Sequence, residues 1–458
     1  MSTWKFHLLT FGCKVNQYES QSLREAWQRK GGEECDDPSV ADVVCVNSCA
    51  ITAKGERDAR AALLRLRRTA PQARLVLTGC AAQLPGVLAP VRRRNAQQPR
   101  PTVDYIIPQA DKARLLDALM PFPAEGGQQV PHAAANAAQT FPPFAIDGFR
   151  RARPVLKVQD GCEHRCTYCI VPLTRGRSRS RDPQAVLAEA RRLLRAGHAE
   201  IMVSGINLRQ YGRDKPEYGD FWSLLVWLDR ELAPEFAGKA RLRISSLEPG
   251  QLDARGVDSL LSCRLVCPHL HISLQHASPH MLRRMGRGHY RAETLQDAVR
   301  ALAAQWPIMG LGADIILGFP GETEADVDCL LDFVAATSFS YAHVFPYSVR
   351  PGTAAAAFAG HIAPQEKQER ARRVREAVAR QQAVFRQAQL ALPAMLLAAD
   401  VSEGQGTRKT AGIRGVNEFY VPCRLLTPVP AMPLSGLVPV RPTGLDAAGL
   451  LVEPAGTL

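Results

Sequence analysis

The sequence predicts an α/β protein in three parts: an open parallel α/β domain at the N-terminus, a complete or partial parallel β/α barrel in the centre, and a small β-barrel at the C-terminus. Strand-like and helix-like segments alternate over the first ~110 residues and again, for longer, in the middle of the chain, which is typical of parallel strands joined by crossover helices. A stretch rich in Pro, Ala, Gln and Gly separates these two runs. After Pro393, short strand-like segments rich in Pro, Gly and Val follow one another.

The N-terminal run contains three expected strands, HLLTF, ADVVCVNS and RLVLTG, with helices expected over residues 18–30 and 53–68. We assign residues 1–120 to this domain. Residues 121–147 have no sustained apolar period and are expected to form a linker.

The central run contains six expected strands, each followed by a plausible helix: PVLKVQ, AEIMVSG, RLRISS, HLHISLQ, GLGADIILGF and YAHVFPYS. Six such units fit a parallel barrel better than a short open sheet. A strongly charged helix over residues 365–389 closes the run, so the central domain is placed at 148–389. The C-terminal domain, 390–458, contains the expected strands EFYVPCRLL and GLVPVRP.

Composition limits the classes of protein that this chain can belong to. Its 458 residues, 46% of them apolar, can bury the cores of more than one domain. The N-terminus has no signal-peptide pattern and no apolar run approaches the ~18 residues of a membrane span, so a cytoplasmic protein without membrane attachment is expected. In that reducing compartment the twelve cysteines are expected to be metal ligands, catalytic thiols or buried apolar residues. A net charge of +13 is compatible with an RNA partner, and also with the Arg-rich composition of a GC-rich genome.

The segment DGCEHRCTYCIVP places Cys162, Cys166 and Cys169 at C-x3-C-x2-C spacing, directly after an expected strand. Thiolates are the usual ligands of a [4Fe–4S] cluster, and three of them leave one iron without a protein ligand. Zinc is the alternative, but it usually has four protein ligands and no fourth Cys or His follows at a suitable distance, although His164 lies inside the triplet.

CEHRCTYC resembles the signature of the radical SAM superfamily. The resemblance implies a partial (β/α)6 barrel in which the open iron chelates the amino and carboxylate groups of S-adenosylmethionine. Reductive cleavage would then give a 5′-deoxyadenosyl radical that abstracts a hydrogen atom from the substrate. The cofactor supplies the difficult chemistry, and the protein positions it.

Cys13, Cys49 and Cys80 are far apart in the sequence, yet each follows an expected strand, in LLTFGC, VVCVNSC and LVLTGC. The carboxyl ends of parallel strands share one edge of a sheet, where such folds bind ligands, so these thiols can meet and hold a second cluster. Taken singly, each would more often be an inert buried cysteine, and it is the three together that favour a cluster.

FGCKVNQYES, NSCAITAKGERDAR and LTGCAAQ are similar to the three segments of the methylthiotransferase N-terminal domain. The resemblance implies that Cys13, Cys49 and Cys80 carry an auxiliary [4Fe–4S] cluster, making two clusters in all. It covers nearly the whole chain, and more weakly a C-terminal module like TRAM. In this family one S-adenosylmethionine supplies a methyl group and another the radical, sulfur arrives through the auxiliary cluster, and the product is a C–SCH3 group.

Branches of the family modify N6-isopentenyladenosine in tRNA, N6-threonylcarbamoyladenosine in tRNA, or an aspartate of a ribosomal protein. GCKVNQYES and RGRSRSR resemble the threonylcarbamoyladenosine branch, which implies methylthiolation at C2 of the modified adenosine beside the anticodon. The expected partners are the tRNA anticodon loop, an electron donor such as flavodoxin or ferredoxin, and a sulfur source. A non-enzymatic iron–sulfur or zinc RNA-binding module is the remaining alternative.

Five further residues are expected near S-adenosylmethionine because they match segments that line its pocket in the superfamily. Each polar one could instead cap a helix. They are Tyr168, inside the cysteine triplet, and Gly205, Ser245, Gln275 and Asp314 in the strand-end segments.

The arginines of RGRSRSR, at 175, 177, 179 and 181, could meet phosphates or fold back on the protein. Two departures from the family pattern stand out. SLQHAS replaces the usual SLQSGS, which puts the conformation of that loop in doubt, and the C-terminal tail is electrically neutral. No role is assigned to the other cysteines, at positions 35, 45, 263, 267, 329 and 423.

Overall fold

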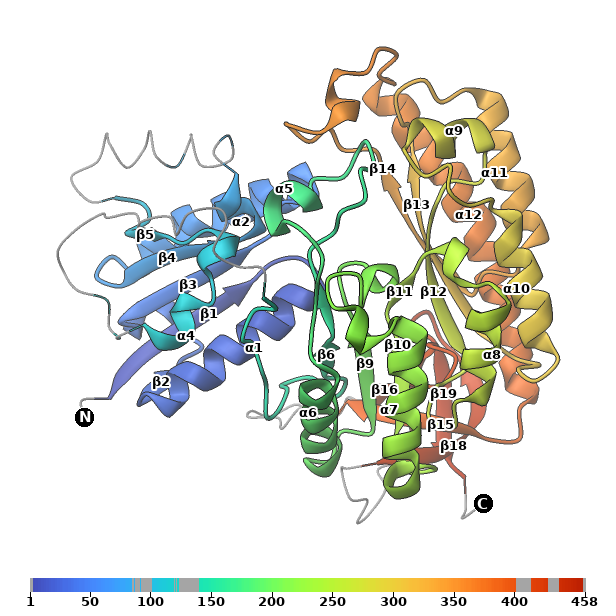
Figure 1. The fold of residues 1–458 in the computed structure, drawn as a ribbon, viewed down its shortest axis with the longest axis horizontal. Coiled ribbons are helices and arrows are strands. Elements are labelled where there is room, and N and C mark those ends of the chain that lie inside the picture. The colour runs from blue at the N-terminus through green and yellow to red at the C-terminus, as the bar shows by residue number, and fades with distance from the viewer. Residues whose placement is uncertain are drawn as a thin grey trace. The chain divides into compact units, whose positions relative to one another are not determined.

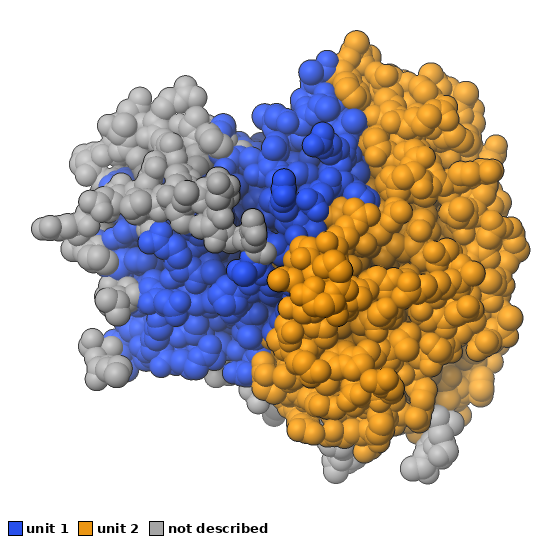
Figure 2. Space-filling view, viewed as in Figure 1, with its two compact units in different colours: residues 1–147, 159–181, 348–357 blue, residues 148–158, 182–347, 358–458 orange. Residues whose placement is uncertain are grey.

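The computed structural model describes residues 3–84, 86, 91, 101–118, 120, 122, 140–400, 413–426 and 436–455. The chain divides into two compact units (Figure 2). Unit 1 comprises residues 1–147, 159–181 and 348–357, and unit 2 comprises residues 148–158, 182–347 and 358–458. Most of the expected linker, residues 121 and 123–139, lies outside the described residues. The domain boundaries at 120, 147 and 389 stay predictions.

Unit 1 contains a five-stranded sheet in the order β2-β1-β3-β4-β5, and every neighbouring pair is parallel (Figure 1). The open parallel domain predicted from the alternating segments is thereby confirmed. The edge strands β2 and β5 were not expected. The strands are β1 (Trp4–Thr10), β2 (Gly32–Glu34), β3 (Val43–Ser48), β4 (Arg74–Gly79) and β5 (Tyr105–Ile106).

Polar contacts fix two of the helices of unit 1. The Oγ1 of Thr52 accepts the N–H of Gly55 at the start of α2, which satisfies one free donor of that helix. The indole N–H of Trp27 donates to the carbonyl of Leu115 at 2.8 Å, so that α1 is tied to α4 in the core. The elements are α1 (Lys14–Arg29), α2 (Ala53–Thr69), α4 (Arg114–Asp117), α5 (Val171–Arg175), β7 (Gln159–Asp160), β8 (Arg179–Ser180), η1 (Pro38–Val40), η2 (Cys80–Gln83), η3 (Gln109–Asp111) and η7 (Ala354–Ala357).

Unit 2 contains the six strand–helix units that the sequence predicts, arranged as two parallel sheets, β10-β9-β6 and β11-β12-β13-β14. Only Ser245 separates β10 from β11, so the two sheets follow one another in an open series. This is the architecture of a partial barrel. The strands are β6 (Val155–Lys157), β9 (Glu200–Ser204), β10 (Arg241–Ile244), β11 (Ser246–Leu247), β12 (His269–Gln275), β13 (Gly310–Leu317) and β14 (Tyr341–Pro346).

Helices cover the outer side of these strands (Figure 1). The long charged helix α12 packs against β14, β13 and α11, and Thr323 with Asp326 forms a capping box at the start of α11. The helices are α6 (Pro183–Arg195), α7 (Phe221–Phe236), α8 (Ala254–Ser262), α9 (Pro279–Arg284), α10 (Glu293–Ala303), α11 (Glu324–Ala336), α12 (Pro364–Ala388), η4 (Leu208–Gln210), η5 (Pro216–Tyr218), η6 (Pro249–Gln251) and η8 (Gln389–Ala391).

The C-terminal segment of unit 2 closes into a five-stranded barrel in the order β15-β16-β17-β19-β18, as the sequence predicts. Apolar side chains such as Leu397, Val440 and Val452 fill its interior. Across the described residues, the helices include none with the length and apolarity that a bilayer crossing requires. The barrel strands are β15 (Met395–Asp400), β16 (Arg414–Val416), β17 (Pro422–Leu425), β18 (Leu437–Leu445) and β19 (Leu450–Pro454).

Candidate functional site

The first group of cysteines lies at the carboxyl edge of the sheet in unit 1. Cys49 follows β3, which pairs with β1 on one side and with β4 on the other. Cys13 is the N-cap residue before α1, shortly after β1, and Cys80 begins η2 directly after β4. The three sulfur atoms are close enough for Cys13 and Cys80 each to affect the pKa of Cys49 electrostatically. The structure thus brings together thiols that are 36 and 31 positions apart in the sequence (49 − 13 and 80 − 49).

Two glycines make this close approach possible. Gly12 and Gly79 both have φ of +95°, in the left-handed region that an L side chain rarely adopts. A Cβ atom at Gly12 would lie 2.7 Å from the Sγ of Cys49, and one at Gly79 would lie 2.4 Å from the carbonyl oxygen of Ser48. Glycine therefore lets the loops after β1 and β4 turn tightly against the end of β3.

The chemistry of these donors fits an iron–sulfur cluster. Burial raises the pKa of the Cys49 thiol to about 11, and the backbone N–H of Ile51, 3.5 Å from the sulfur, partly offsets this effect. A metal ion that replaces the proton allows such a buried thiol to bind as a thiolate. Among the described residues, neither cysteine group has all three sulfur atoms within 4.8 Å of one another. A single zinc ion with Zn–S bonds of about 2.3 Å would need three sulfur atoms closer together than that.

The second group of cysteines, Cys162, Cys166 and Cys169, lies in one loop of unit 1 between β7 and α5. Cys162 is buried, and the other two are partly exposed. The N–H of Cys162 donates to the carbonyl of Gly176 at 3.0 Å, and the N–H of Cys169 donates to that of Cys166 at 3.0 Å. Three thiol side chains on a compact, internally bonded loop fit the cluster that the spacing predicts.

Gly161 fixes the start of this loop. Its φ is +73°, and a Cβ atom there would lie 1.9 Å from the carbonyl oxygen of Arg177. Because β7 pairs with β8 antiparallel, the backbone on both sides of the loop is held at this point. No side chain can be added at Gly161 without moving the loop.

The five residues expected near S-adenosylmethionine fall in both units. Tyr168 belongs to unit 1, and the other four belong to unit 2. Gly205 follows β9, Ser245 lies between β10 and β11, and Gln275 ends β12, so these three share the carboxyl edge of the barrel strands. Asp314 lies inside β13, and its Oδ2 is 3.1 Å from the Nε2 of His271.

Two of these positions have features that are typical of ligand sites. Gln275 has φ of +65°, one of two positive values for non-glycine residues in the described structure. Such backbone strain concentrates at functional sites. The buried hydroxyl of Ser245 has no hydrogen-bond partner within the described residues, which leaves a polar atom available to a bound molecule.

Comparison with known proteins identifies the family. Residues 156–334 match the Radical SAM superfamily, and residues 5–98 match Uncharacterized protein family UPF0004. The chain is 34% identical over 378 residues to the threonylcarbamoyladenosine tRNA methylthiotransferase MtaB of Bacillus subtilis, covering 82% of this chain and 80% of that protein. The chain belongs to the radical SAM methylthiotransferase family. It is therefore an enzyme that uses S-adenosylmethionine and [4Fe–4S] clusters.

Other proteins that are similar in sequence or in fold have other names. The chain is 31% identical to a tRNA-2-methylthio-N(6)-dimethylallyladenosine synthase of Pelotomaculum thermopropionicum, over 80% of each chain. Among solved structures, the radical S-adenosylmethionine methyltransferase TsrM of Kitasatospora setae, with cobalamin and a [4Fe–4S] cluster bound, superposes with a TM-score of 0.51 at 16% identity. That match covers 78% of this chain and 77% of TsrM, and it supports the fold alone.

The arginines that follow the second cysteine group mostly fold back on this methylthiotransferase. The side chain of Arg175 is 1% exposed and Arg181 is buried, whereas Arg177 is 91% exposed. Arg179 pairs with Asp160 at 3.4 Å. Of the two alternatives for this segment, folding back on the protein therefore holds for Arg175, and Arg177 is the arginine of the run that faces solvent.

The departure SLQHAS is accommodated inside unit 2. His276 is fully buried, and its Nδ1 accepts the N–H of Ser278 at 3.0 Å. Its Nε2 lies 3.6 Å from Glu322, which stands in the GFPGET segment. The imidazole thus fills and braces the turn after β12, where the family usually has small residues.

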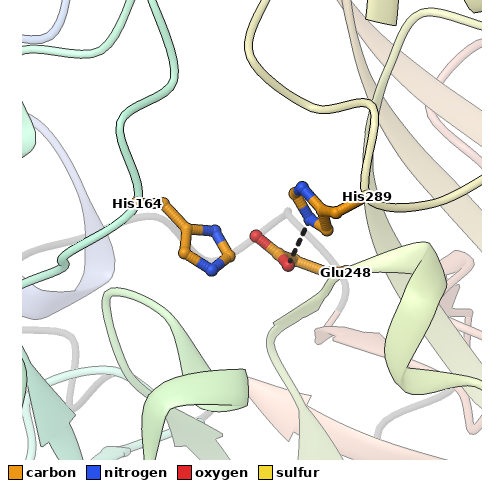
Figure 3. A group of neighbouring side chains, drawn as sticks. All are labelled: His164, Glu248 and His289. Atoms are coloured by element: carbon orange, nitrogen blue, oxygen red, sulfur yellow. Dashed lines mark hydrogen bonds and ion pairs between the residues drawn. The ribbon is translucent and has the colours of Figure 1, made fainter. Parts of the chain in front are cut away.

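A buried carboxylate at the barrel edge was missed by the sequence analysis. Glu248, just after β11, lies 3.3 Å from the Nε2 of His289 (Figure 3). Arg209 and Arg287 approach the same carboxylate at 3.3 and 3.5 Å. The strand-end rule that selected Ser245 could also have selected Glu248, because ISSLEP places it at the same edge.

Proposed function

We propose that this enzyme methylthiolates C2 of N6-threonylcarbamoyladenosine next to the anticodon of tRNA, giving 2-methylthio-N6-threonylcarbamoyladenosine. The observation that carries the proposal is the presence of two separate three-cysteine groups in a chain whose relatives include MtaB proteins at 32–34% identity. A radical enzyme that only cleaved S-adenosylmethionine would need one such group. Sulfur transfer gives the second one a role.

We assign Cys162, Cys166 and Cys169 to the cluster that binds S-adenosylmethionine. Cys13, Cys49 and Cys80 are assigned to the auxiliary cluster. The first cluster, when bound, supplies the electron that cleaves S-adenosylmethionine reductively, and the second carries the sulfur to be transferred. The chain's own contribution is to hold three thiolates at each place and to leave one iron of each cube open.

Tyr168, Gly205, Ser245, Gln275 and Asp314 are proposed to surround S-adenosylmethionine. The unpartnered hydroxyl of Ser245 would accept or donate one hydrogen bond to it, and the strained backbone of Gln275 would present a peptide group at the strand edge. The further partners are an electron donor such as flavodoxin or ferredoxin and a sulfur source in the cytoplasm. The division into domains at 1–120, 148–389 and 390–458 belongs to the same proposal.

Mass spectrometry of tRNA nucleosides from cells with and without the gene tests the substrate. Loss of the methylthio nucleoside with accumulation of N6-threonylcarbamoyladenosine is the expected result. Loss of the methylthio derivative of isopentenyladenosine would instead assign the dimethylallyladenosine branch, in line with the 31% identical relative. Unchanged tRNA would contradict both, and the aspartate of a ribosomal protein would then be examined.

Complementation with cysteine variants tests the site. Cys162→Ala and Cys49→Ala should each abolish the methylthio nucleoside. Cys329→Ala, which alters an exposed cysteine of α11 outside both groups, is the control and should restore it. A Cys49→Ala variant that modifies tRNA at the wild-type rate would overturn the two-cluster assignment.

A further inference from the structure

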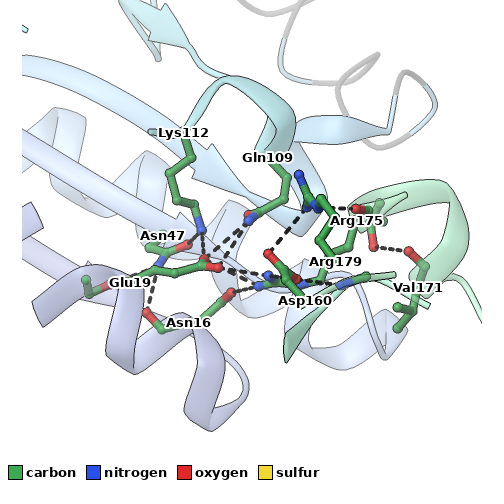
Figure 4. A network of polar contacts seen from close by, with 12 residues as sticks. Asn16, Glu19, Asn47, Gln109, Lys112, Asp160, Val171, Arg175 and Arg179 are labelled. Carbon is green, nitrogen blue, oxygen red and sulfur yellow. Dashed lines mark hydrogen bonds and ion pairs between the residues drawn. The ribbon is translucent and has the colours of Figure 1, made fainter. Parts of the chain in front are cut away.

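A buried network of charged side chains lies behind the cysteines of unit 1. Figure 4 shows Arg175 among its acidic partners. The Nη1 of Arg175 is 2.8 Å from the Oε1 of Glu19 and 3.0 Å from the Oδ1 of Asp160. Its Nη2 donates to the Oδ1 of Asn16 at 2.7 Å. The side chains of Arg175, Glu19 and Asp160 are each at most 1% exposed. A guanidinium group is thus held on several sides, away from solvent.

Such a network contributes little net stability. Removing charges from water costs several kcal/mol per ion, and well-packed apolar side chains of similar volume would often stabilise a fold equally well. Here the network is extended further, since the Nζ of Lys112 lies 2.6 Å from the Oε2 of Glu19 and 2.9 Å from the Oδ1 of Asn47. The position of this network in unit 1 indicates a role other than stabilising the fold.

The network includes residues of the elements that carry both cysteine groups. Asn16 and Glu19 stand on α1, within two turns of Cys13, and Asp160 is two residues before Cys162. Helix α5, which ends at Arg175, packs against η2, which begins at Cys80. The guanidinium of Arg175 also interacts electrostatically with the thiols of Cys13 and Cys80.

We propose that Arg175 is a positioning residue of the auxiliary site and that its fixed positive charge raises the reduction potential of the cluster bound there. Glu19 holds the guanidinium in place and partly cancels its charge. The inference rests on the proposed function, because it requires a cluster at Cys13, Cys49 and Cys80.

The direction of each effect follows from the charges. A guanidinium group stays protonated at every accessible pH, and its field is poorly screened inside a protein. Reducing a cluster adds one negative charge, which a nearby cation stabilises, and net charge around a cluster is one of the factors that set its potential. Loss of the Arg175 charge should therefore lower the potential, and loss of the Glu19 charge should raise it.

The experiment uses the full chain with Cys162, Cys166 and Cys169 replaced by alanine, so that the auxiliary cluster alone contributes to the signal. After anaerobic reconstitution with iron and sulfide, a redox titration followed by electron paramagnetic resonance gives its midpoint potential. Arg175→Gln should shift the midpoint to a more negative value and Glu19→Gln to a more positive one. Arg175→Lys, which retains the charge, should stay close to the parent.

Arg177→Gln is the matched control, because it removes the same charge from a side chain that is 91% exposed and should leave the midpoint unchanged. A purely structural role would lower the iron content of both variants without opposite shifts in potential. Shifts of the same sign, or none, would overturn the inference while leaving the proposed function intact. A parent protein that binds no cluster would instead overturn the assignment of the auxiliary site, and the inference with it.

Discussion

Replacing Gly12 by alanine should remove the auxiliary cluster while leaving the fold largely intact. Two costs arise at this position. The left-handed backbone, with φ of +95°, costs an alanine about 1–2 kcal/mol. In addition, the new Cβ atom would lie 2.7 Å from both the Cβ and the Sγ of Cys49. Carbon atoms pack at roughly 3.5–4.0 Å, so a relative movement of about 1 Å is required.

The backbone of Cys49 is held in place and cannot make that movement. It directly follows β3, the strand held between β1 and β4, and Ser48 is paired in register with Gly79. The sulfur must therefore rotate or shift, which changes its position relative to the other two thiols. Gly12→Ala should reduce the iron content of the reconstituted full-length protein by about half, because one of two [4Fe–4S] clusters is lost.

Gly31→Ala is the matched control for the backbone cost. Gly31 also has a left-handed φ, +81°, but a Cβ atom there would meet nothing within 4 Å. Both variants should lose the backbone cost in free energy of unfolding, Gly12→Ala should lose the steric cost in addition, and only Gly12→Ala should lose iron. Iron determination and cluster absorbance after anaerobic reconstitution measure the difference. Full iron in Gly12→Ala, or equal loss in Gly31→Ala, would refute the steric reasoning.

Three further predictions concern stability and RNA binding. Arg243 and Arg241 hold the pKa of the buried Glu200 carboxyl at about 2, below its ordinary 4.5. The ionised carboxylate therefore stabilises the fold by roughly 3 kcal/mol, a contribution that is complete above pH 4.5 and is lost as the pH falls toward 2. Glu200→Gln should lower the free energy of unfolding at pH 7 by roughly that amount and flatten its acid dependence in denaturant titrations; an equally steep acid loss would contradict this. Asn417→Ala should lower the free energy of unfolding by about 1–3 kcal/mol, because the Oδ1 of Asn417 accepts the backbone N–H groups of Phe419 and Val421. Hydrogen exchange at these two amides should become faster, and exchange at the wild-type rate would contradict this. Arg177→Ala should change stability by less than about 0.5 kcal/mol, yet reduce the slope of log tRNA affinity against log salt by roughly 0.7–0.9, and an unchanged slope would exclude a phosphate contact.

The architecture could be predicted because its strands have strong local signals. VVCVNS and RLVLTG are continuous apolar runs bounded by turn residues, and they became β3 and β4. β2 and β5 were missed because they have three and two residues, too few for a period to show, and lie at the edges of the sheet. Their pairing depends on neighbours that are distant in sequence.

The meeting of Cys13, Cys49 and Cys80 could be predicted for a topological reason. Parallel strands end at one edge, so a residue placed just after each of three neighbouring strands must lie at that edge. The partners of Arg175 could not be predicted, because Glu19 is 156 positions away and no period relates the two. Within RGRSRSR, the sequence does not distinguish the buried arginine from the exposed one.

The partners of Arg241 and Arg243 in unit 2 could not be predicted from the sequence either. These two arginines also contact the C-terminal barrel. Both come from the expected strand RLRISS, and both turn inward to Glu200, each with its Nε at 2.6 Å from the carboxylate. Their remaining nitrogens donate to backbone carbonyls of the C-terminal barrel, Arg241 to Leu396 and Val416 at 2.7 and 2.9 Å. Hydrogen bonds from buried arginines therefore hold the TRAM-like C-terminal barrel against the central strands.

These contacts with the C-terminal barrel lie at the amino ends of the central strands. β10 begins at Arg241 and β13 begins at Gly310, where a Cβ atom would lie 2.1 Å from the carbonyl oxygen of Phe419. Gly205 and Gln275 mark the opposite, carboxyl ends. The ring of Tyr420, whose φ is +67°, lies against His269 with ring centroids 4.7 Å apart. The turn from 417 to 421 thus packs against the amino ends of the central strands, and this part of the C-terminal barrel is not available to bind RNA.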